Sequence, residues 1–204
     1  MYKDLREEET EMESYYIYLV FTKTGTWLSR VIATFSDMKY VHASISFDDS
    51  FTRMYSFGRR NPDNPFSGGF VEENLKGGVY QKFTESRCLI YKVKVTELQY
   101  YSLKEELAKF QNEADKYHYN LIGLVGAKLG IPLKRKHHYF CSQFISEILI
   151  NSKIYDIDKE PELISPDDLY SVENMELLYE GFISMYNGEP NLVMNPALKA
   201  TAMI

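Results

Sequence analysis

The stretch YFCSQFISEILI, residues 139–150, decides the fold. Its apolar residues recur at the spacing of one helical face: Phe144, Ile145, Ile148 and Leu149. The pattern predicts a helix that begins at Cys141, where a loop ends. A helix N-terminus presents unpaired N–H groups and the positive end of the helix dipole, and both stabilise a thiolate, the nucleophilic form of cysteine. The N–H of Ser142 is placed to help stabilise an oxyanion.

The amino-acid composition limits the number of domains, the kinds of partner and the kinds of cysteine chemistry that the chain can have. The chain has 204 residues, 45% of them hydrophobic, which suits one domain. Its 29 acidic and 23 basic residues give a net charge of −6, which does not support a nucleic-acid partner. Its two cysteines, Cys88 and Cys141, are too few for a disulfide framework or a Cys₄ zinc site. Any thiol or imidazole chemistry must come from these and from four histidines.

The chain divides into three parts. Residues 1–14 are a polar, acidic leader that we expect to be flexible, residues 15–186 form the domain, and residues 187–204 form a tail. The leader lacks the apolar core of a signal peptide, and the longest apolar runs are far below the roughly 18 residues of a membrane-spanning helix. We therefore expect a cytoplasmic protein with reduced thiols and no integral membrane segment.

The hydrophobic pattern predicts strands early and helices inserted later, an α+β fold. The predicted strands are residues 15–22, 41–47, 51–57, 70–75 and 88–95, and the predicted helices are residues 26–36, 100–117 and 141–150. Residues 165–168 form a turn or a helix start, and an apolar stretch comes next at 177–186.

His42 is the best candidate for the base that a thiolate needs. The strand at 41–47 alternates, with His42, Ser44 and Ser46 on one face and Val41, Ala43, Ile45 and Phe47 on the core-facing side. A catalytic imidazole is usually oriented by a third group. If Asp48-Asp49-Ser50 is the hairpin loop, His42 lies opposite Ser56, and a shift of one residue gives Tyr55 or Phe57. Ser56 or Tyr55 is the predicted orienting residue.

Two short blocks carry a resemblance: Val41-His42-Ala43-Ser44-Ile45 early in the chain and Tyr139-Phe140-Cys141-Ser142-Gln143-Phe144-Ile145 late. Together they resemble the circularly permuted branch of the NlpC-type papain-like superfamily, which includes YiiX-like and lecithin-retinol-acyltransferase-like proteins. In ordinary NlpC peptidases the cysteine helix precedes the histidine strand, whereas here the order is reversed. Ser165-Pro166-Asp167-Asp168-Leu169 also resembles the segment after the cysteine helix in that branch. The resemblance spans about residues 15–185.

The resemblance implies a small antiparallel β-sheet packed on the cysteine helix, with Cys141 as nucleophile and His42 as base. It implies a cysteine hydrolase or acyltransferase that acts on an amide or ester bond of a cell-wall-type peptide or a lipid acyl group. Many permuted members carry an acidic residue or histidine on the strand after the histidine strand, where this chain offers Tyr55 and Ser56. We expect Tyr55, Ser142, Gln143 and Glu72 to contact a small peptide or lipid-like substrate, with no cofactor.

Other interpretations stay open. A serine orients an imidazole more weakly than a carboxylate does, so the same fold could be a catalytically weak or inactive binding module, or a regulatory domain. His137, His138 and Cys141 are too close together to converge on a metal ion, and no metal is expected. The basic stretch Lys134-Arg135-Lys136 is either a solvated loop or a contact for an anionic substrate or lipid headgroup at the rim of the cleft. The sequence does not fix the oligomeric state.

Overall fold

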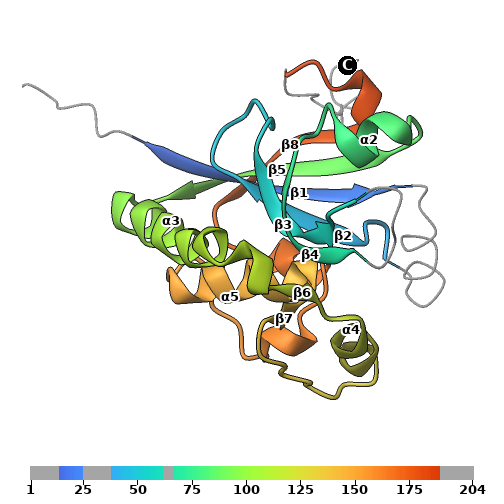
Figure 1. Ribbon diagram of the computed structural model, residues 1–204. Coiled ribbons are helices and arrows are strands. Elements are labelled where there is room, and N and C mark those ends of the chain that lie inside the picture. The colour runs from blue at the N-terminus through green and yellow to red at the C-terminus, as the bar shows by residue number, and fades with distance from the viewer. Residues whose placement is uncertain (1–13, 25–37, 62–66, 189–204) are drawn as a thin grey trace, which may run out of the picture.

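The computed structural model describes residues 14–24, 38–61 and 67–188. Its centre is a six-stranded antiparallel sheet in the order β4-β3-β2-β1-β5-β8 (Figure 1). The strands are β1 (Tyr15–Lys23), β2 (His42–Ser46), β3 (Met54–Arg59), β4 (Gly68–Glu73), β5 (Arg87–Val95) and β8 (Met175–Phe182). The predicted α+β class with an antiparallel sheet is confirmed.

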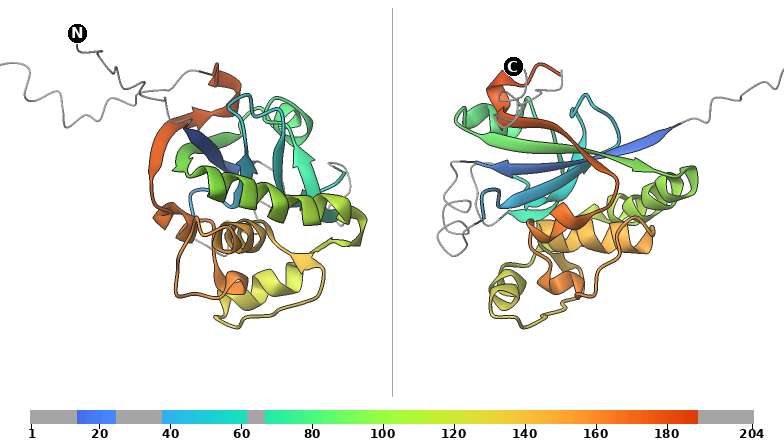
Figure 2. Two further views of the ribbon diagram at one scale, coloured as in Figure 1. Left: turned by 90° about the vertical axis from the view of Figure 1, so that its left-hand side faces the viewer. Right: turned by 180° about the vertical axis from the view of Figure 1, so that it is seen from behind.

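Four α-helices are present in the described residues: α2 (Gly78–Lys82), α3 (Glu97–Asn112), α4 (Leu121–Lys128) and α5 (Cys141–Asn151). Two short strands, β6 (His118–Tyr119) and β7 (His138–Tyr139), pair in parallel, and four 3₁₀ turns complete the fold: η1 (Ala114–Lys116), η2 (Pro161–Leu163), η3 (Asp168–Ser171) and η4 (Ile183–Met185). Helices α3 and α5 lie against one face of the sheet, whereas α2 lies on the other side (Figures 1 and 2).

Helix α5 begins at Cys141, as the sequence predicts. The four side chains of its predicted apolar face are fully buried at 0% exposure: Phe144, Ile145, Ile148 and Leu149. They pack against sheet residues such as Leu19, Ala43 and Ile45 in the larger hydrophobic cluster. Each such burial stabilises the fold by about 1.5–3 kcal/mol, so this packing holds the cysteine end of the helix firmly against β2 and β3.

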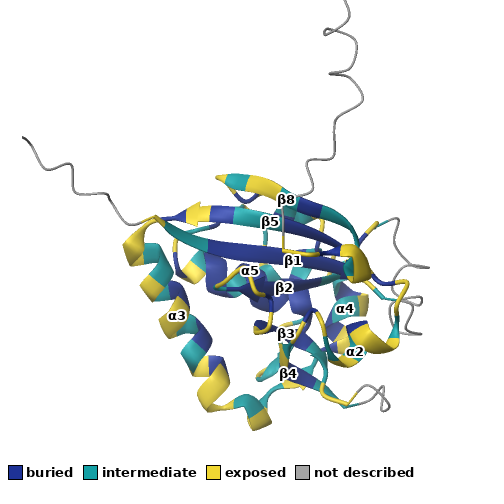
Figure 3. Ribbon diagram, turned by 90° about the horizontal axis from the view of Figure 1, so that it is seen from above, coloured by how far each residue is buried: buried dark blue, intermediate teal, exposed yellow. Residues whose placement is uncertain are grey.

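The second face of the sheet is also covered. Tyr80 of α2 and Tyr179 of β8 pack with Val20 and other residues in a second cluster. Figure 3 shows the result, with buried positions along the central strands and exposed ones on the outer side of α3. Ser44 and Ser46, which the alternation placed on the face opposite the core-facing residues, are also buried, at 1% and 0% exposure. The polar face of β2 is therefore an interior surface.

Several predicted boundaries are wrong for physical reasons. The strand predicted at 51–57 begins at Met54, because Phe51 has a positive φ of 49° and turns the chain while its ring is fully buried. The helix predicted at 100–117 is α3, which starts earlier because Thr96 and Gln99 form a capping box, and a separate 3₁₀ turn comes after it. The apolar stretch at 177–186 belongs to β8 and the turn after it.

Some expectations fall on other parts of the chain. The predicted helix at 26–36 lies outside the described residues, as do nearly all of the leader at 1–14 and the tail at 187–204. Within the described ranges, no helix has the length and apolar character needed to cross a bilayer.

Candidate active site

Cys141 lies where the chain passes from an extended residue into helix α5. Phe140, just before it, has φ −109° and ψ 168°, and Cys141 itself is 2% exposed. Its sulfur lies 4.0 Å from the carbonyl oxygen of Val41, the residue that precedes His42. Two segments that are 100 residues apart in the chain are thus in contact at the Cys141 thiol.

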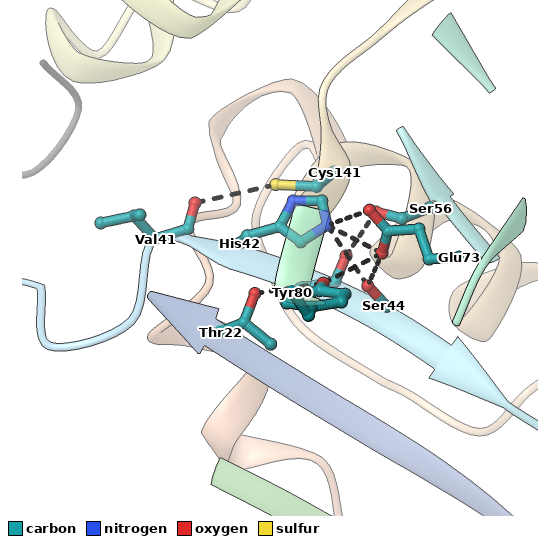
Figure 4. Close-up of polar contacts among 9 residues, drawn as sticks. Thr22, Val41, His42, Ser44, Ser56, Glu73, Tyr80 and Cys141 are labelled. Atoms are coloured by element: carbon teal, nitrogen blue, oxygen red, sulfur yellow. Dashed lines mark hydrogen bonds and ion pairs between the residues drawn. The ribbon is translucent and has the colours of Figure 1, made fainter. Parts of the chain in front are cut away.

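The imidazole of His42 lies between Cys141 and Glu73 (Figure 4). Its Nε2 is 3.1 Å from each carboxylate oxygen of Glu73, so the Nε2–H donates to the carboxylate. The other ring nitrogen, Nδ1, is then on the side of Cys141, where it can take the thiol proton. The His42 and Glu73 side chains are 21% and 17% exposed, so the pair is largely withdrawn from water.

Three hydroxyl groups complete the surroundings of the Glu73 carboxylate. Ser44, on the same strand as His42, donates to Oε2 at 2.7 Å, and its oxygen is 3.3 Å from the Nε2 of His42. Tyr80 donates to Oε2 at 3.3 Å. Thr22 of β1 lies 3.4 Å from the Tyr80 hydroxyl and extends the chain of hydrogen bonds. Side chains of β2 and α2 therefore hold the carboxylate in one orientation toward the imidazole, and Thr22 of β1 supports Tyr80.

Charge and hydrogen bonding set the protonation of the pair. Burial would lower the pKa of His42, but the Glu73 charge and hydrogen bonds with Cys141 and Glu73 outweigh it and raise that pKa well above 6.5. Burial would raise the pKa of Glu73, but the charge and hydrogen bond of His42, with hydrogen bonds from Ser44 and Tyr80, lower it overall. The site therefore stabilises the imidazolium that forms when Nδ1 takes a proton, with the Glu73 carboxylate on one side of the ring and the sulfur of Cys141 on the other.

The structure does not place Ser56 against His42. Strands β2 and β3 pair Ile45 with Tyr55 and Ser46 with Met54, a register two residues away from the predicted one. The hydroxyl of Ser56 donates to the carbonyl oxygen of Ala43 at 2.6 Å and is fully buried. The predicted register was wrong because the hairpin loop extends past Asp48-Asp49-Ser50 to the buried turn at Phe51. Glu73 occupies the position predicted for Ser56.

Three of the four predicted substrate contacts have buried side chains. Tyr55 is 9% exposed and stacks on Phe70 in the core, with ring centroids 6.3 Å apart. Ser142 and Gln143 are each 1% exposed; Ser142 donates to the carbonyl of Ile164 at 2.7 Å, and Gln143 reaches Glu162 at 3.5 Å. These side chains attach α5 to the segment after it, and only the backbone of Ser142 remains suited to a role at the thiol.

Glu72 is the predicted contact that the structure leaves accessible. It is exposed and lines a pocket of about 510 Å³. Arg59, Arg60 and Asp115 also line this pocket, and so do Glu73 and Tyr80 of the hydrogen-bond network. The pocket therefore adjoins the residue whose carboxylate holds the imidazole.

Sequence reasoning did not give Glu73 the role of orienting His42. The sequence analysis singled out the neighbouring Glu72, as a substrate contact. The signal for Glu73 is its position on β4: Val71 and Glu73 alternate with Phe70 and Glu72, and Phe70 belongs to the core beside α5. Glu73 must then point to the opposite face, the one that carries His42 and Ser44.

The remaining histidines and the second cysteine take no part in this arrangement. Among the described residues, no three His, Cys, Asp or Glu side chains form a group that could hold a metal ion. The His118 and His138 rings pack at 5.3 Å on the paired strands β6 and β7. Cys88 is fully buried in β5, as its apolar strand predicts.

Comparisons of the chain with protein-family models, with curated proteins and with solved structures find no match.

Proposed function

We propose that this protein is a cysteine-dependent hydrolase or acyltransferase that acts on an amide or ester carbonyl. One observation carries the proposal: the imidazole of His42 lies between a thiol at a helix N-terminus and a buried carboxylate. A thiol nucleophile, a base and a group that orients the base are the three parts of nucleophilic acyl transfer.

The residues support a balanced sequence of steps. Nδ1 of His42 takes the proton of the Cys141 thiol, and the thiolate attacks the substrate carbonyl carbon. When the tetrahedral intermediate collapses, the bond to the leaving amine or alcohol breaks, and the imidazolium gives that group its proton. A thioester remains on Cys141. Water or an acceptor amine then attacks the thioester while His42 accepts its proton, and the proton returns to the sulfur as the acyl group leaves.

Glu73 supports both halves of this cycle. Its carboxylate fixes the ring so that Nδ1 faces the sulfur, and its charge stabilises the imidazolium that forms when the thiol ionises. Because Ser44 and Tyr80 also donate to it, the carboxylate stays oriented in both protonation states of the imidazole.

We also propose that the fold is papain-like, of the circularly permuted NlpC type. The chain order supports this assignment, because the histidine strand β2 precedes the cysteine helix α5 and the helix packs on an antiparallel sheet. A small peptide or lipid-like acyl substrate and a cytoplasmic location belong to the same proposal.

Trapping the thioester tests the proposed chemistry. The protein is incubated with p-nitrophenyl esters of short and long acyl chains, quenched in acid, and analysed by intact-mass and peptide mass spectrometry. The expected result is one acyl adduct on Cys141, lost in Cys141→Ala and strongly reduced in His42→Ala. Cys88→Ala is the matched control and keeps the adduct. An adduct on another residue, or none with any ester, contradicts the proposal.

A binding module on the same fold is the second candidate, favoured by the 2% exposure of Cys141. In that case iodoacetamide would modify Cys141 no faster than a free thiol at neutral pH, and His42→Ala would leave the rate unchanged. A fast rate that depends on His42 excludes this candidate.

A further inference from the structure

The chain between β6 and β7 forms a projection, residues 120–137, which we call the α4 projection. Its two ends are joined at the base, where the backbone N–H of His118 donates to His137 at 2.8 Å and that of Asn120 donates to Tyr139 at 2.9 Å. Helix α4 lies away from the main sheet at the lower end of the molecule in Figure 1. Because β7 leads through Phe140 to Cys141, the base of the projection adjoins the candidate active site.

The outer surface of the projection is apolar. Five of the nine large hydrophobic side chains that are exposed in the described residues belong to it. They are Leu121 (43% exposed), Ile122 (59%), Val125 (62%), Leu129 (68%) and Ile131 (50%), and we call them the apolar ridge. So many exposed apolar side chains on a single short segment indicate an interaction surface rather than scattered surface residues.

Glycines on the inner side of α4 explain why the apolar side chains point outward. A Cβ at Gly126 would lie 2.7 Å from a methyl carbon of Leu133 and 2.8 Å from the carbonyl oxygen of Ile131. The returning chain therefore packs directly on the helix backbone, and Gly123 and Gly126 are buried. The inner side has no room for large side chains, so they lie on the surface.

The projection also concentrates positive charge. Residues 120–137 contain Lys128, Lys134, Arg135 and Lys136 and no acidic residue, in a chain whose net charge is −6. The Lys134 side chain is 83% exposed, and its ammonium lies 3.9 Å from the carboxylate of Glu162. Lys128 and Lys136 are also exposed. A segment with a formal charge of +4, of which Glu162 offsets part at Lys134, lies beside an apolar ridge, and this is the combination found on surfaces that bind anionic membranes.

We propose that the α4 projection docks on the surface of an anionic lipid bilayer, with the apolar ridge at the boundary between headgroups and acyl chains and the lysines against the phosphates. Docking in this orientation brings the base of the projection, and with it Cys141, close to the lipid. The binding itself does not need the Cys141 chemistry. Its consequence, that the acyl substrate is a lipid, rests on the proposed function.

Charge distinguishes the bilayer from a second copy of the chain. A two-fold dimer through this face would bring two basic segments against each other, because the same patch faces itself in such an interface. An anionic bilayer instead supplies the opposite charge and an apolar layer at the depth that the ridge requires.

Vesicle co-sedimentation of the full chain tests the docking. The protein is mixed with vesicles of phosphatidylcholine alone or with about 30% phosphatidylserine, at about 0.1 M and about 0.5 M salt. We expect binding to the anionic vesicles that falls at high salt. Ile122→Glu/Val125→Glu and Lys134→Glu/Lys136→Glu should each weaken it about tenfold or more.

The matched controls are Leu98→Glu and Lys94→Glu, which alter an exposed leucine and an exposed lysine outside the projection and should leave binding unchanged. Equal effects of the control and projection variants, absence of binding to anionic vesicles, or a ridge-dependent dimer in light scattering would overturn the docking. Cys141→Ala should bind vesicles like the unaltered protein. Vesicle binding without a thioester on Cys141 would leave the docking intact and refute the proposed function. A thioester on Cys141 without vesicle binding would refute the docking and leave the proposed function intact.

Discussion

The two cysteines have the same low exposure and very different neighbours. Cys88 lies in β5 at 0% exposure, among the apolar side chains of the second cluster, where burial raises the pKa of its thiol to about 12. Cys141 is 2% exposed, but it begins a helix and faces an imidazole that a carboxylate holds in place. Burial therefore does not separate a structural cysteine from a candidate nucleophile in this protein, whereas the neighbouring groups do.

The two regions also differ in how many polar groups they keep out of water. The surroundings of Cys88 are held together by the packing of hydrophobic side chains. The Cys141 environment keeps His42 and Glu73 largely out of water, with Ser44 and Tyr80 committed to the carboxylate. Buried ion pairs contribute little net stability compared with apolar residues of similar size. Stability alone does not account for this arrangement, whereas the proposed chemistry at the Cys141 thiol requires it.

Alkylation should separate the two cysteines most strongly. Iodoacetamide should modify Cys141 of the native protein and leave Cys88 unmodified. His42→Ala removes the imidazolium that stabilises the thiolate, so the rate at Cys141 should fall about 100-fold, while Cys88 stays protected. Peptide mass spectrometry over time measures both rates. Modification of Cys88 at a similar rate would mean that the native environments do not differ as described.

Glu73→Gln should give the next largest effect. The variant removes the Glu73 charge, the largest cause that raises the pKa of His42, so that pKa falls. The NMR titration of the His42 ring should move to lower pH, and the acylation rate should drop about 10- to 100-fold. Glu105→Gln alters an exposed carboxylate on α3 and is the matched control. An unchanged His42 titration in Glu73→Gln would contradict the role of Glu73.

The shifted pKa values of His42 and Glu73 should also make the stability of the fold depend on pH. The folded-state pKa of His42 is raised, so its contribution is present below about pH 6.5 and is lost as the pH rises through the raised pKa. The pKa of Glu73 is lowered, so its contribution is present above about pH 4.5 and is lost as the pH falls through the lowered pKa. The pair should therefore stabilise the fold most between about pH 4.5 and 6.5.

Urea unfolding across pH measures this effect against the double variant His42→Gln/Glu73→Gln. The difference in unfolding free energy should reach about 1–2 kcal/mol inside that window and shrink on both sides. The control is Glu113→Gln/Lys116→Gln, which removes an exposed ion pair of 2.7 Å and should change stability little. A difference that does not vary with pH would contradict the assigned direction of the two pKa shifts.

Local patterns in the sequence predict the elements that carry the site. The apolar spacing after Cys141 fixes where α5 begins, and the alternation at 41–47 places His42 and Ser44 on one face. The third member depends on contacts that no local pattern specifies. Glu73 is 31 residues from His42 and reaches it only because β4 pairs with β3 in one particular register. That register depends on a hairpin whose turn is set by the burial of Phe51, a tertiary effect.

Gly58→Ala should give the smallest effect on the acylation rate, and it tests how closely His42 and Glu73 must be positioned. An added Cβ would lie 3.3 Å from Oε1 of Glu73 and 3.5 Å from Cε1 of His42, so the carboxylate must shift by a few tenths of an ångström. Since small displacements of catalytic groups slow reactions, the acylation rate should fall about threefold without loss of the fold. Gly77→Ala is the matched control, because its Cβ would meet nothing closer than 3.6 Å. If both variants slow acylation of Cys141, or if neither does, the close fit of Gly58 against His42 and Glu73 does not matter to the reaction. The positioning of His42 by Glu73 must then tolerate more movement than this geometry implies.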